Sequence, residues 1–213
     1  MLDDPQLLRL RAALTPLEAP LTAPAAPARP APPRPAAVLV LLYPLADAPH
    51  LVLERRAPDL PEHAGQISLP GGGHRPSDGS FLATAEREVL EELGVPPAAY
   101  TPWGRLDPVV IPASNYLVVP FVAYAEERPP LRPSAREVAE VLEVPLRSLL
   151  DPALLAEEVW LLRGTRRRVS FFRHGEHKIW GATARVLGQI TAILRDETWD
   201  GRRLEPGEVI DAP

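Results

Sequence analysis

Apolar residues along the 213-residue chain are grouped with two periods, one typical of β-strands and one typical of helices. Runs rich in valine, leucine and aromatic residues predict strands at residues 37–43, 50–55 and 116–124. A further strand-like segment covers residues 103–111, with a break at Pro108, which cannot donate a backbone hydrogen bond. The middle of the chain is therefore rich in strands.

Three- and four-residue spacing of apolar positions predicts helices at residues 5–14, 81–93 and 182–194. Residues 146–155 are also expected to be helical, around a proline at position 152. The short segment at residues 137–144 fits a helix and a strand equally well. The helices therefore stand at both ends and in the middle of the chain.

Residues 159–163 and 168–173 predict a β-hairpin that turns near Gly164 and Thr165. Along the whole chain, strands and helices are mixed without a regular strand–helix–strand alternation. This order favours an α+β fold, or an α/β sandwich with a mixed sheet, over a doubly wound parallel fold.

The N-terminal region differs in composition from the rest. Residues 19–36 contain seven prolines and seven alanines and no acidic residue. Because proline fixes φ and lacks an N–H group, this segment should be neither a helix nor a central strand, and we expect an extended connector. The chain is thus divided into an N-terminal helix (1–18), this connector, and one globular domain (37–213).

Composition and charge exclude several classes of function. No apolar run approaches the ~20 residues that a membrane span requires, and the absence of cysteine excludes disulfides, thiol nucleophiles and zinc–thiolate sites. A net charge of -5 argues against nonspecific binding to nucleic acid or to acidic membranes. The first residues lack the features of a signal peptide, so a cytoplasmic location is expected. Both a monomer and a homodimer remain open.

The middle helix carries an unusual arc of acidic side chains. Ser80 is a plausible N-cap, and Gly94 marks the C-terminal end. At about 100° per residue, Glu92 lies ~40° from Glu88, and Glu91 lies ~60° away on the other side. Three carboxylates therefore share one face of the helix.

Two interpretations of this face compete. In the first, it is a solvated surface with Arg87 and Glu91 as an i,i+4 ion pair, worth a few tenths of a kcal/mol. In the second, a divalent cation offsets the repulsion between the carboxylates, and Mg²⁺ prefers such oxygen ligands. The second gains weight from Gly71 and Gly72, which precede the helix and let a backbone approach a metal or phosphate without an intervening Cβ.

The stretch resembles the Nudix box, G-x5-E-x7-R-E-U-x-E-E-x-G-U, in which U is apolar. Residues 87–95 match its second half at every specified position. Counted back without a gap, Gly73 matches the first glycine, but Gly79 stands at the glutamate. One inserted residue instead aligns Gly72 with the glycine and Asp78 with the glutamate.

The altered first half is similar to that of one branch of the family, the coenzyme A diphosphatases. Their box begins PGG-x2-D-x2-D-x-S, and their upstream signature is L-L-T-x-R-S-A-x3-R-x3-G-x3-F-P-G-G. Matching positions in this chain are Arg55, Ala57, Gly65, Pro70, Gly71, Gly72, Asp78, Ser80, Thr84, Ala85, Arg87, Glu88, Glu91, Glu92 and Gly94. Departures are Arg56, Pro61, Leu69 and Arg75, which replace serine, arginine, phenylalanine and aspartate.

The resemblance implies an α/β/α sandwich with a mixed sheet and hydrolysis of a nucleoside diphosphate linked to another moiety. Carried over by position, Glu88 and Glu92 would hold Mg²⁺ or Mn²⁺, and Arg87 would orient the carboxylates. Glu91 would ligate the metal or act as the base. Glu137 or another carboxylate remains an alternative base.

The same resemblance implies a small-molecule nucleotide substrate, coenzyme A or its thioesters. The expected products are 4′-phosphopantetheine, or its acyl form, and adenosine 3′,5′-bisphosphate. Arg55 and Arg56 are candidates for binding the 3′-phosphate, and the run 166–168 is a second candidate or simply solvated. Other substrates (ADP-ribose, a dinucleotide cofactor, an oxidised nucleoside triphosphate) remain alternatives, as does a nucleotide-binding module without catalysis.

Overall fold

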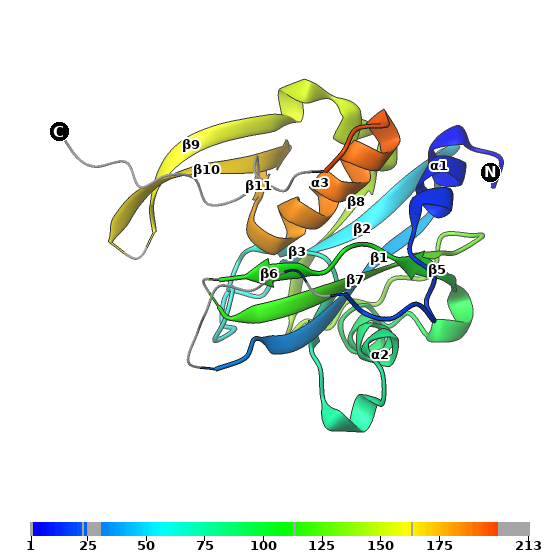
Figure 1. Ribbon diagram of the computed structural model, residues 1–213, viewed down its shortest axis with the longest axis horizontal. Coiled ribbons are helices and arrows are strands. Elements are labelled where there is room, and N and C mark those ends of the chain that lie inside the picture. The colour runs from blue at the N-terminus through cyan, green and yellow to red at the C-terminus, as the bar shows by residue number, and fades with distance from the viewer. Residues whose placement is uncertain (1, 23, 25–30, 113, 163, 200–213) are drawn as a thin grey trace.

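The computed structural model of the protein describes residues 2–22, 24, 31–112, 114–162 and 164–199 (Figure 1). Its α-helices are α1 (Pro5–Ala13), α2 (Phe81–Leu93) and α3 (Gly181–Arg195). Its strands are β1 (Arg34–Leu45), β2 (Ala48–Arg56), β3 (Ile67–Ser68), β4 (Gly71–Gly73), β5 (Thr101–Arg105), β6 (Val109–Ile111), β7 (Tyr116–Tyr124), β8 (Val138–Pro145), β9 (Leu155–Leu162), β10 (Thr165–His174) and β11 (His177–Ile179). Short 3-10 helices are η1 (Pro76–Asp78), η2 (Pro97–Ala99), η3 (Leu146–Leu150) and η4 (Pro152–Leu154).

Strand β1 lies in the middle of a mixed sheet. The strand order is β3-β2-β1-β7-β5, with β4 paired to β1, β6 to β7 and β8 to β2. β1 and β7 run parallel, with Arg34 opposite Tyr116, whereas β1 pairs with β2 and β4 in antiparallel fashion. A second sheet, β11-β10-β9, extends as a hairpin from the body of the molecule (Figure 1).

The two faces of the central sheet are covered by different helices. Side chains of β1 alternate, so that Leu39 and Leu41 join a core with α2, and Val40 and Leu42 join a core with α1 and α3. Figure 1 shows α2 on one side of the sheet and α3 on the other. Both faces of β1 are buried, which explains its nearly continuous apolar sequence. The predicted sandwich with a mixed sheet is confirmed.

Strand β1 begins at Arg34, inside the segment predicted as a connector without a central strand. Pro35 lacks an N–H group but still takes part in the pairing, because its carbonyl accepts the N–H of His74 at 2.9 Å. Earlier in the connector, the carbonyls of Ala19 and Pro20 accept hydrogen bonds from Arg105. Positions 23 and 25–30 of the predicted connector lie outside the described residues. The division into domains stays a prediction.

Most of the other predicted elements are present. The segment at 103–111 is divided between β5 and β6, the ambiguous segment at 137–144 is strand β8, and the terminal hairpin is β9–β10, with Arg163 outside the described residues. Residues 146–155 form 3-10 turns and the start of β9 rather than one helix, because Pro152 has no N–H group to donate and begins a new turn. No helix in the described part of the chain is long and apolar enough to cross a membrane.

Candidate active site

Helix α2 carries the acidic side chains, and its ends are fixed as the sequence predicts. The Ser80 hydroxyl accepts the N–H of Ala83 at 3.1 Å, and Gly94 closes the helix in a left-handed conformation with φ 68°. The segment after β7 then covers the C-terminal end, where the Ser134 N–H donates to the carbonyl of Glu92 at 2.8 Å. The last turn, which bears two of the carboxylates, is thereby fixed to the neighbouring loop.

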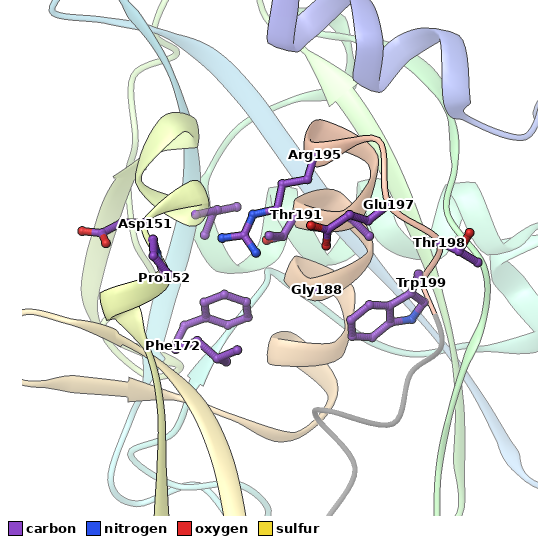
Figure 2. Close-up of a pocket in the computed structure, with 12 residues that line it drawn as sticks. Asp151, Pro152, Phe172, Gly188, Thr191, Arg195, Glu197, Thr198 and Trp199 are labelled. Atoms are coloured by element: carbon purple, nitrogen blue, oxygen red, sulfur yellow. The ribbon is translucent and has the colours of Figure 1, made fainter.

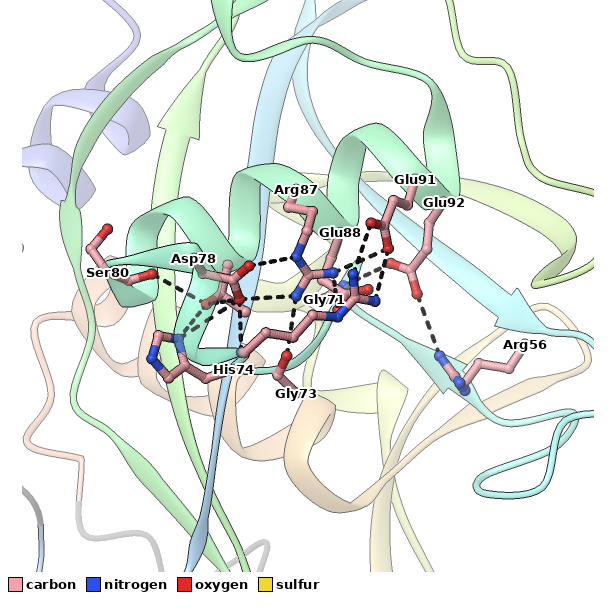
Figure 3. Close-up of polar contacts among 12 residues, drawn as sticks. Arg56, Gly71, Gly73, His74, Asp78, Ser80, Arg87, Glu88, Glu91 and Glu92 are labelled. Carbon is pink, nitrogen blue, oxygen red and sulfur yellow. Dashed lines mark hydrogen bonds and ion pairs between the residues drawn. The ribbon is translucent and has the colours of Figure 1, made fainter.

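Arg87 stands at the centre of the polar contacts (Figure 3). Its Nε donates to Asp78 at 2.8 Å, and its Nη1 donates to Glu88 at 2.7 Å and to Glu91 at 3.1 Å. Its Nη2 donates to the carbonyl of Gly73 at 3.1 Å. One guanidinium therefore joins Glu88 and Glu91 to the glycine strand, and its orienting role stays a prediction.

Asp78 occupies the position that the shifted alignment assigns to the box glutamate. Its side chain is only 3% exposed and accepts hydrogen bonds from Arg87, from the Thr84 hydroxyl at 2.9 Å and from the Arg75 N–H at 2.8 Å. The hydrogen bonds from Arg87 and from that N–H hold the pKa of Asp78 well below its usual range. Asp78 is thus an ionised anchor for Arg87.

Glu92 is almost completely buried, with 2% of its surface exposed. Its carboxylate accepts the N–H of Gly71 at 2.8 Å and lies 3.5 Å from Arg56. Glu54 adjoins it, is fully buried, and receives a long hydrogen bond of 3.4 Å from Ser68. Burial raises the pKa of both glutamates, and the charge of Glu54 raises that of Glu92 further.

Glu54 is a residue of this site that sequence reasoning missed. On β2, Leu51 and Leu53 pack in the core with α3, whereas Val52 packs in the core with α2. Glu54 continues the Val52 face and so points toward α2. The signal was available: an acidic residue occupies a core-facing position of a buried strand, which is rare unless the charge has a partner.

The glycines of β4 leave room for the helix to approach. A Cβ at Gly72 would lie 2.6 Å from a carboxylate oxygen of Glu88, so any larger residue would displace that side chain. At Gly71, where φ is 151°, a Cβ would lie 2.4 Å from the carbonyl oxygen of Ala37 and 2.6 Å from the Cα of Val38. Glycine is required here by contact with both the sheet and the helix.

Glu88 and Glu91 differ in exposure. Glu88 is 8% exposed, and burial raises its pKa against the opposing effect of Arg87. The Glu91 side chain is 39% exposed and is held by Arg87 and by Arg75, whose nearest contact is 3.2 Å. Arg75, which replaces the aspartate of the related branch, is therefore a direct partner of the candidate base.

The two arginines predicted to bind substrate lie on opposite faces of β2. Arg56 approaches Glu92, on the side of α2. Arg55 donates to Glu140 at 2.9 Å, and Glu140 also contacts His177 of β11. The arginine run 166–168 lies on the projecting hairpin (Figure 1). The structure thus brings Arg56 to the carboxylates and leaves Arg55 and this run apart from them.

A cavity of about 310 Å³ borders the glycine strand and Arg56. Its lining includes apolar side chains of the sheet and the start of α3, with Tyr116 and Trp180 among them. Since Gly71 and Gly72 contact the carboxylates and also line this cavity, β4 connects the two. The cavity and the two carboxylates of Glu88 and Glu92 therefore share the glycine strand as a common neighbour.

A second cavity, of about 350 Å³, lies between η4 and α3 (Figure 2). Asp151, Phe172, Arg195 and Trp199 are among its lining residues. None of the predicted site residues borders it. It is therefore separate from the carboxylates.

The carboxylate face suits a divalent cation in its chemistry. Within the described ranges, no three acidic or histidine side chains converge closely enough to form a complete protein-only metal site. Magnesium, however, commonly uses one or two carboxylates together with water and substrate oxygens. The buried oxygen Oε2 of Glu54 has no hydrogen-bond partner, and Glu92 beside it is also shielded from water. Arg56 approaches these two carboxylates no closer than 3.5 Å, and a divalent cation would supply further positive charge.

Replacing Arg87 with lysine should reduce kcat by about 10- to 100-fold, a typical effect of losing a residue that orients metal ligands. A lysine ammonium is a compact charge and cannot reach Asp78, Glu88 and the Gly73 carbonyl together. Steady-state kinetics would measure the change. Arg128→Lys is the matched control, because it alters an arginine–carboxylate pair away from this site; an equal loss in both variants would contradict the role of Arg87.

Comparison with known proteins identifies the family. A model of the NUDIX domain matches residues 33–168. A protein described as an uncharacterized Nudix hydrolase, NudL, from Photorhabdus laumondii is 37% identical over 142 residues, which are 67% of this chain and 75% of that one. Its namesake from Pectobacterium atrosepticum is 34% identical over 167 residues, 76% and 83% of the two chains.

Solved structures agree with the fold. A MutT/nudix family protein from Enterococcus faecalis superposes with a TM-score of 0.51 at 19% identity, over 81% of this chain and 64% of that one. This likeness concerns the fold alone, whereas the domain match and the sequence relatives concern the family. On that basis the chain belongs to the Nudix hydrolases, a family of pyrophosphohydrolases.

Proposed function

We propose that this Nudix hydrolase cleaves the diphosphate of coenzyme A or its thioesters. Nudix enzymes in general use divalent metal ions and act on small nucleotide derivatives. Mg²⁺ or Mn²⁺ is the proposed cofactor, and the products would be adenosine 3′,5′-bisphosphate and 4′-phosphopantetheine or its acyl form. A cytoplasmic location is proposed with it.

The main support for this proposal is the conformation of the upstream signature, which lies beside the cavity. Gly65 donates its N–H to the carbonyl of Arg56 at 3.1 Å, and Arg56 donates its own to Gln66 at 2.9 Å. The signature residues therefore close a tight loop after β2, and part of this loop lines the cavity next to the glycine strand. The apolar lining suits a pantetheine arm, while Arg56 supplies a cation for a phosphate group.

The chain's own residues have separable tasks in this reaction. Glu88 and Glu92 would hold the cation, which when bound neutralises phosphate oxygens and acidifies water. Arg87 contacts Glu88 and Glu91, and is itself held by Asp78 and the Gly73 carbonyl, whereas Glu92 is held by the Gly71 N–H. Glu91, which is more exposed than Glu88 and Glu92, is the candidate to take a proton from the attacking water.

A different nucleoside diphosphate derivative is the alternative substrate. Pro61 stands where the branch signature has its second arginine, and it is exposed. Arg75 replaces an aspartate and contacts Glu91. Both departures alter charge near the site, so ADP-ribose, a dinucleotide cofactor and an oxidised nucleoside triphosphate belong in the same test.

A substrate panel tests the proposal. The protein would be incubated with coenzyme A, acetyl coenzyme A, ADP-ribose, a dinucleotide cofactor and an oxidised nucleoside triphosphate, each with Mg²⁺, with Mn²⁺ and with chelator. We expect metal-dependent release of adenosine 3′,5′-bisphosphate, quantified by chromatography, with kcat/KM for a coenzyme A substrate at least about tenfold above the others, a difference of ~1.4 kcal/mol. Preference for another dinucleotide would refute the substrate, and absence of any turnover would favour a binding module.

A further inference from the structure

Glu54 is the buried charge that the proposed mechanism does not use. Its exposed fraction is 0%, and its position on β2 places it against Glu92 of α2. The Ser68 hydroxyl donates to one of its oxygens over 3.4 Å, and the other oxygen, Oε2, has no hydrogen-bond partner. A buried carboxylate with an unpartnered oxygen is unfavourable, so its retention calls for a partner.

Arg56 is the nearby cation, and it is a poor partner for both glutamates at once. Its Nη1 lies 3.5 Å from Glu92 and 3.9 Å from Glu54, longer than a well-formed charge-assisted hydrogen bond. Its Nε is itself buried without a partner. The Gly71 N–H donates to Glu92 and not to Oε2 of Glu54. The pair Glu54–Glu92 is therefore short of positive charge.

We propose that Glu54 is a further ligand of the divalent cation, acting together with Glu92. The inference rests on the proposed metal-dependent function and adds a ligand from the sheet to those from the helix. The cation would lie between two elements, β2 and α2, rather than on the helix alone. Two carboxylates with water and substrate oxygens agree with what Mg²⁺ and Mn²⁺ accept in proteins.

Direct measurement of Mn²⁺ binding tests this ligand without relying on turnover. Electron paramagnetic resonance of free Mn²⁺ would give the dissociation constant for the wild-type chain and for Glu54→Gln. We expect at least about tenfold weaker binding in the variant, within the range seen when metal-site residues are altered. Glu86→Gln is the matched control: it removes one charge from α2 outside these contacts, and should change the constant by less than about twofold because of screening.

Thermal unfolding distinguishes a metal-ligand role of Glu54 from a purely structural role. Without metal, Glu54→Gln should be as stable as the wild type or more stable, since an amide removes the repulsion with Glu92 and can donate to it. With Mn²⁺, the wild type should gain more in melting temperature than the variant, because tighter binding stabilises more. A merely structural partner of Arg56 would instead lower stability without metal and leave Mn²⁺ affinity unchanged.

The outcomes distinguish this inference from the function on which it rests. Unchanged Mn²⁺ affinity in Glu54→Gln, with metal-dependent turnover in the wild type, would overturn the role of Glu54 and leave the proposed function standing. A wild-type chain that bound no Mn²⁺ and showed no metal-dependent turnover would overturn both.

Discussion

Glu92→Gln should lower kcat for diphosphate hydrolysis by about a thousandfold while the chain stays folded. The estimate follows because losing a catalytic cation's contribution costs several kcal/mol of transition-state stabilisation, and each ~1.4 kcal/mol is tenfold in rate. Glutamine keeps an oxygen that can accept the Gly71 N–H, so the contact between α2 and β4 persists. What it loses is the charge that would hold the metal. Glu88→Gln should behave in the same way.

Three measurements check this result. Circular dichroism and the melting temperature should resemble those of the wild type, while steady-state assays with saturating Mg²⁺ show the loss of kcat. Glu86→Gln serves again as the control on the same helix and should retain activity. If Glu92→Gln and Glu88→Gln both turned over substrate at the normal rate, the assigned metal ligands would be wrong.

Gly71→Ala should destabilise the protein by about 2–6 kcal/mol, from backbone strain and overpacking together. The glycine has φ 151°, and an added Cβ would meet the backbone of Ala37 and Val38 in the neighbouring strand rather than a flexible side chain. Neither the turn nor β1 can move without breaking the pairing that places β4. A loss of this size is a large fraction of the ~5–15 kcal/mol that stabilises a typical domain.

Urea unfolding of Gly71→Ala and Gly73→Ala gives a matched comparison within one strand. A Cβ at Gly73 would meet no atom within 4 Å, and the alanine there should cost little. Its carbonyl would still accept the bond from Arg87. Equal urea midpoints for the two variants would show that the close contact at Gly71 does not make an alanine there more destabilising than one at Gly73.

The sequence was sufficient for the architecture and for the helix that carries the chemistry. The apolar run at 37–43 predicted a strand, which the structure buries on both faces, and the spacing of Glu88, Glu91 and Glu92 placed them on one side of α2. The shifted alignment places Asp78 at the position of the box glutamate. In the structure the Asp78 carboxylate accepts two hydrogen bonds from Arg87. These features depend on local period and spacing, which a sequence records directly.

Features that depend on neighbouring strands were not predictable in the same way. Arg55 and Arg56 are adjacent in sequence, yet the alternation of β2 sends them to opposite faces, so a shared role does not follow from adjacency. The glycines were singled out in the sequence, but that they form strand β4 was not predicted, because three glycines have no side-chain pattern. For Glu54, its core-facing position on β2 was a signal in the sequence, but its partner, Glu92 of a distant helix, was not. Register and packing decide such contacts.

The parallel pairing of β1 with β7 sets an order for assembly of the site. Every residue assigned to the carboxylate cluster lies between these two strands in the sequence, so a ribosome releases the cluster before it releases β7. The long connection between β1 and β7 must then close before these strands can pair in the sheet on which β4 and α2 pack. Closure of long loops slows folding. A nascent chain that ends before Tyr116 thus carries all the chemical groups without the strand that holds them in register. We therefore expect catalytic competence only after β7 has been synthesised.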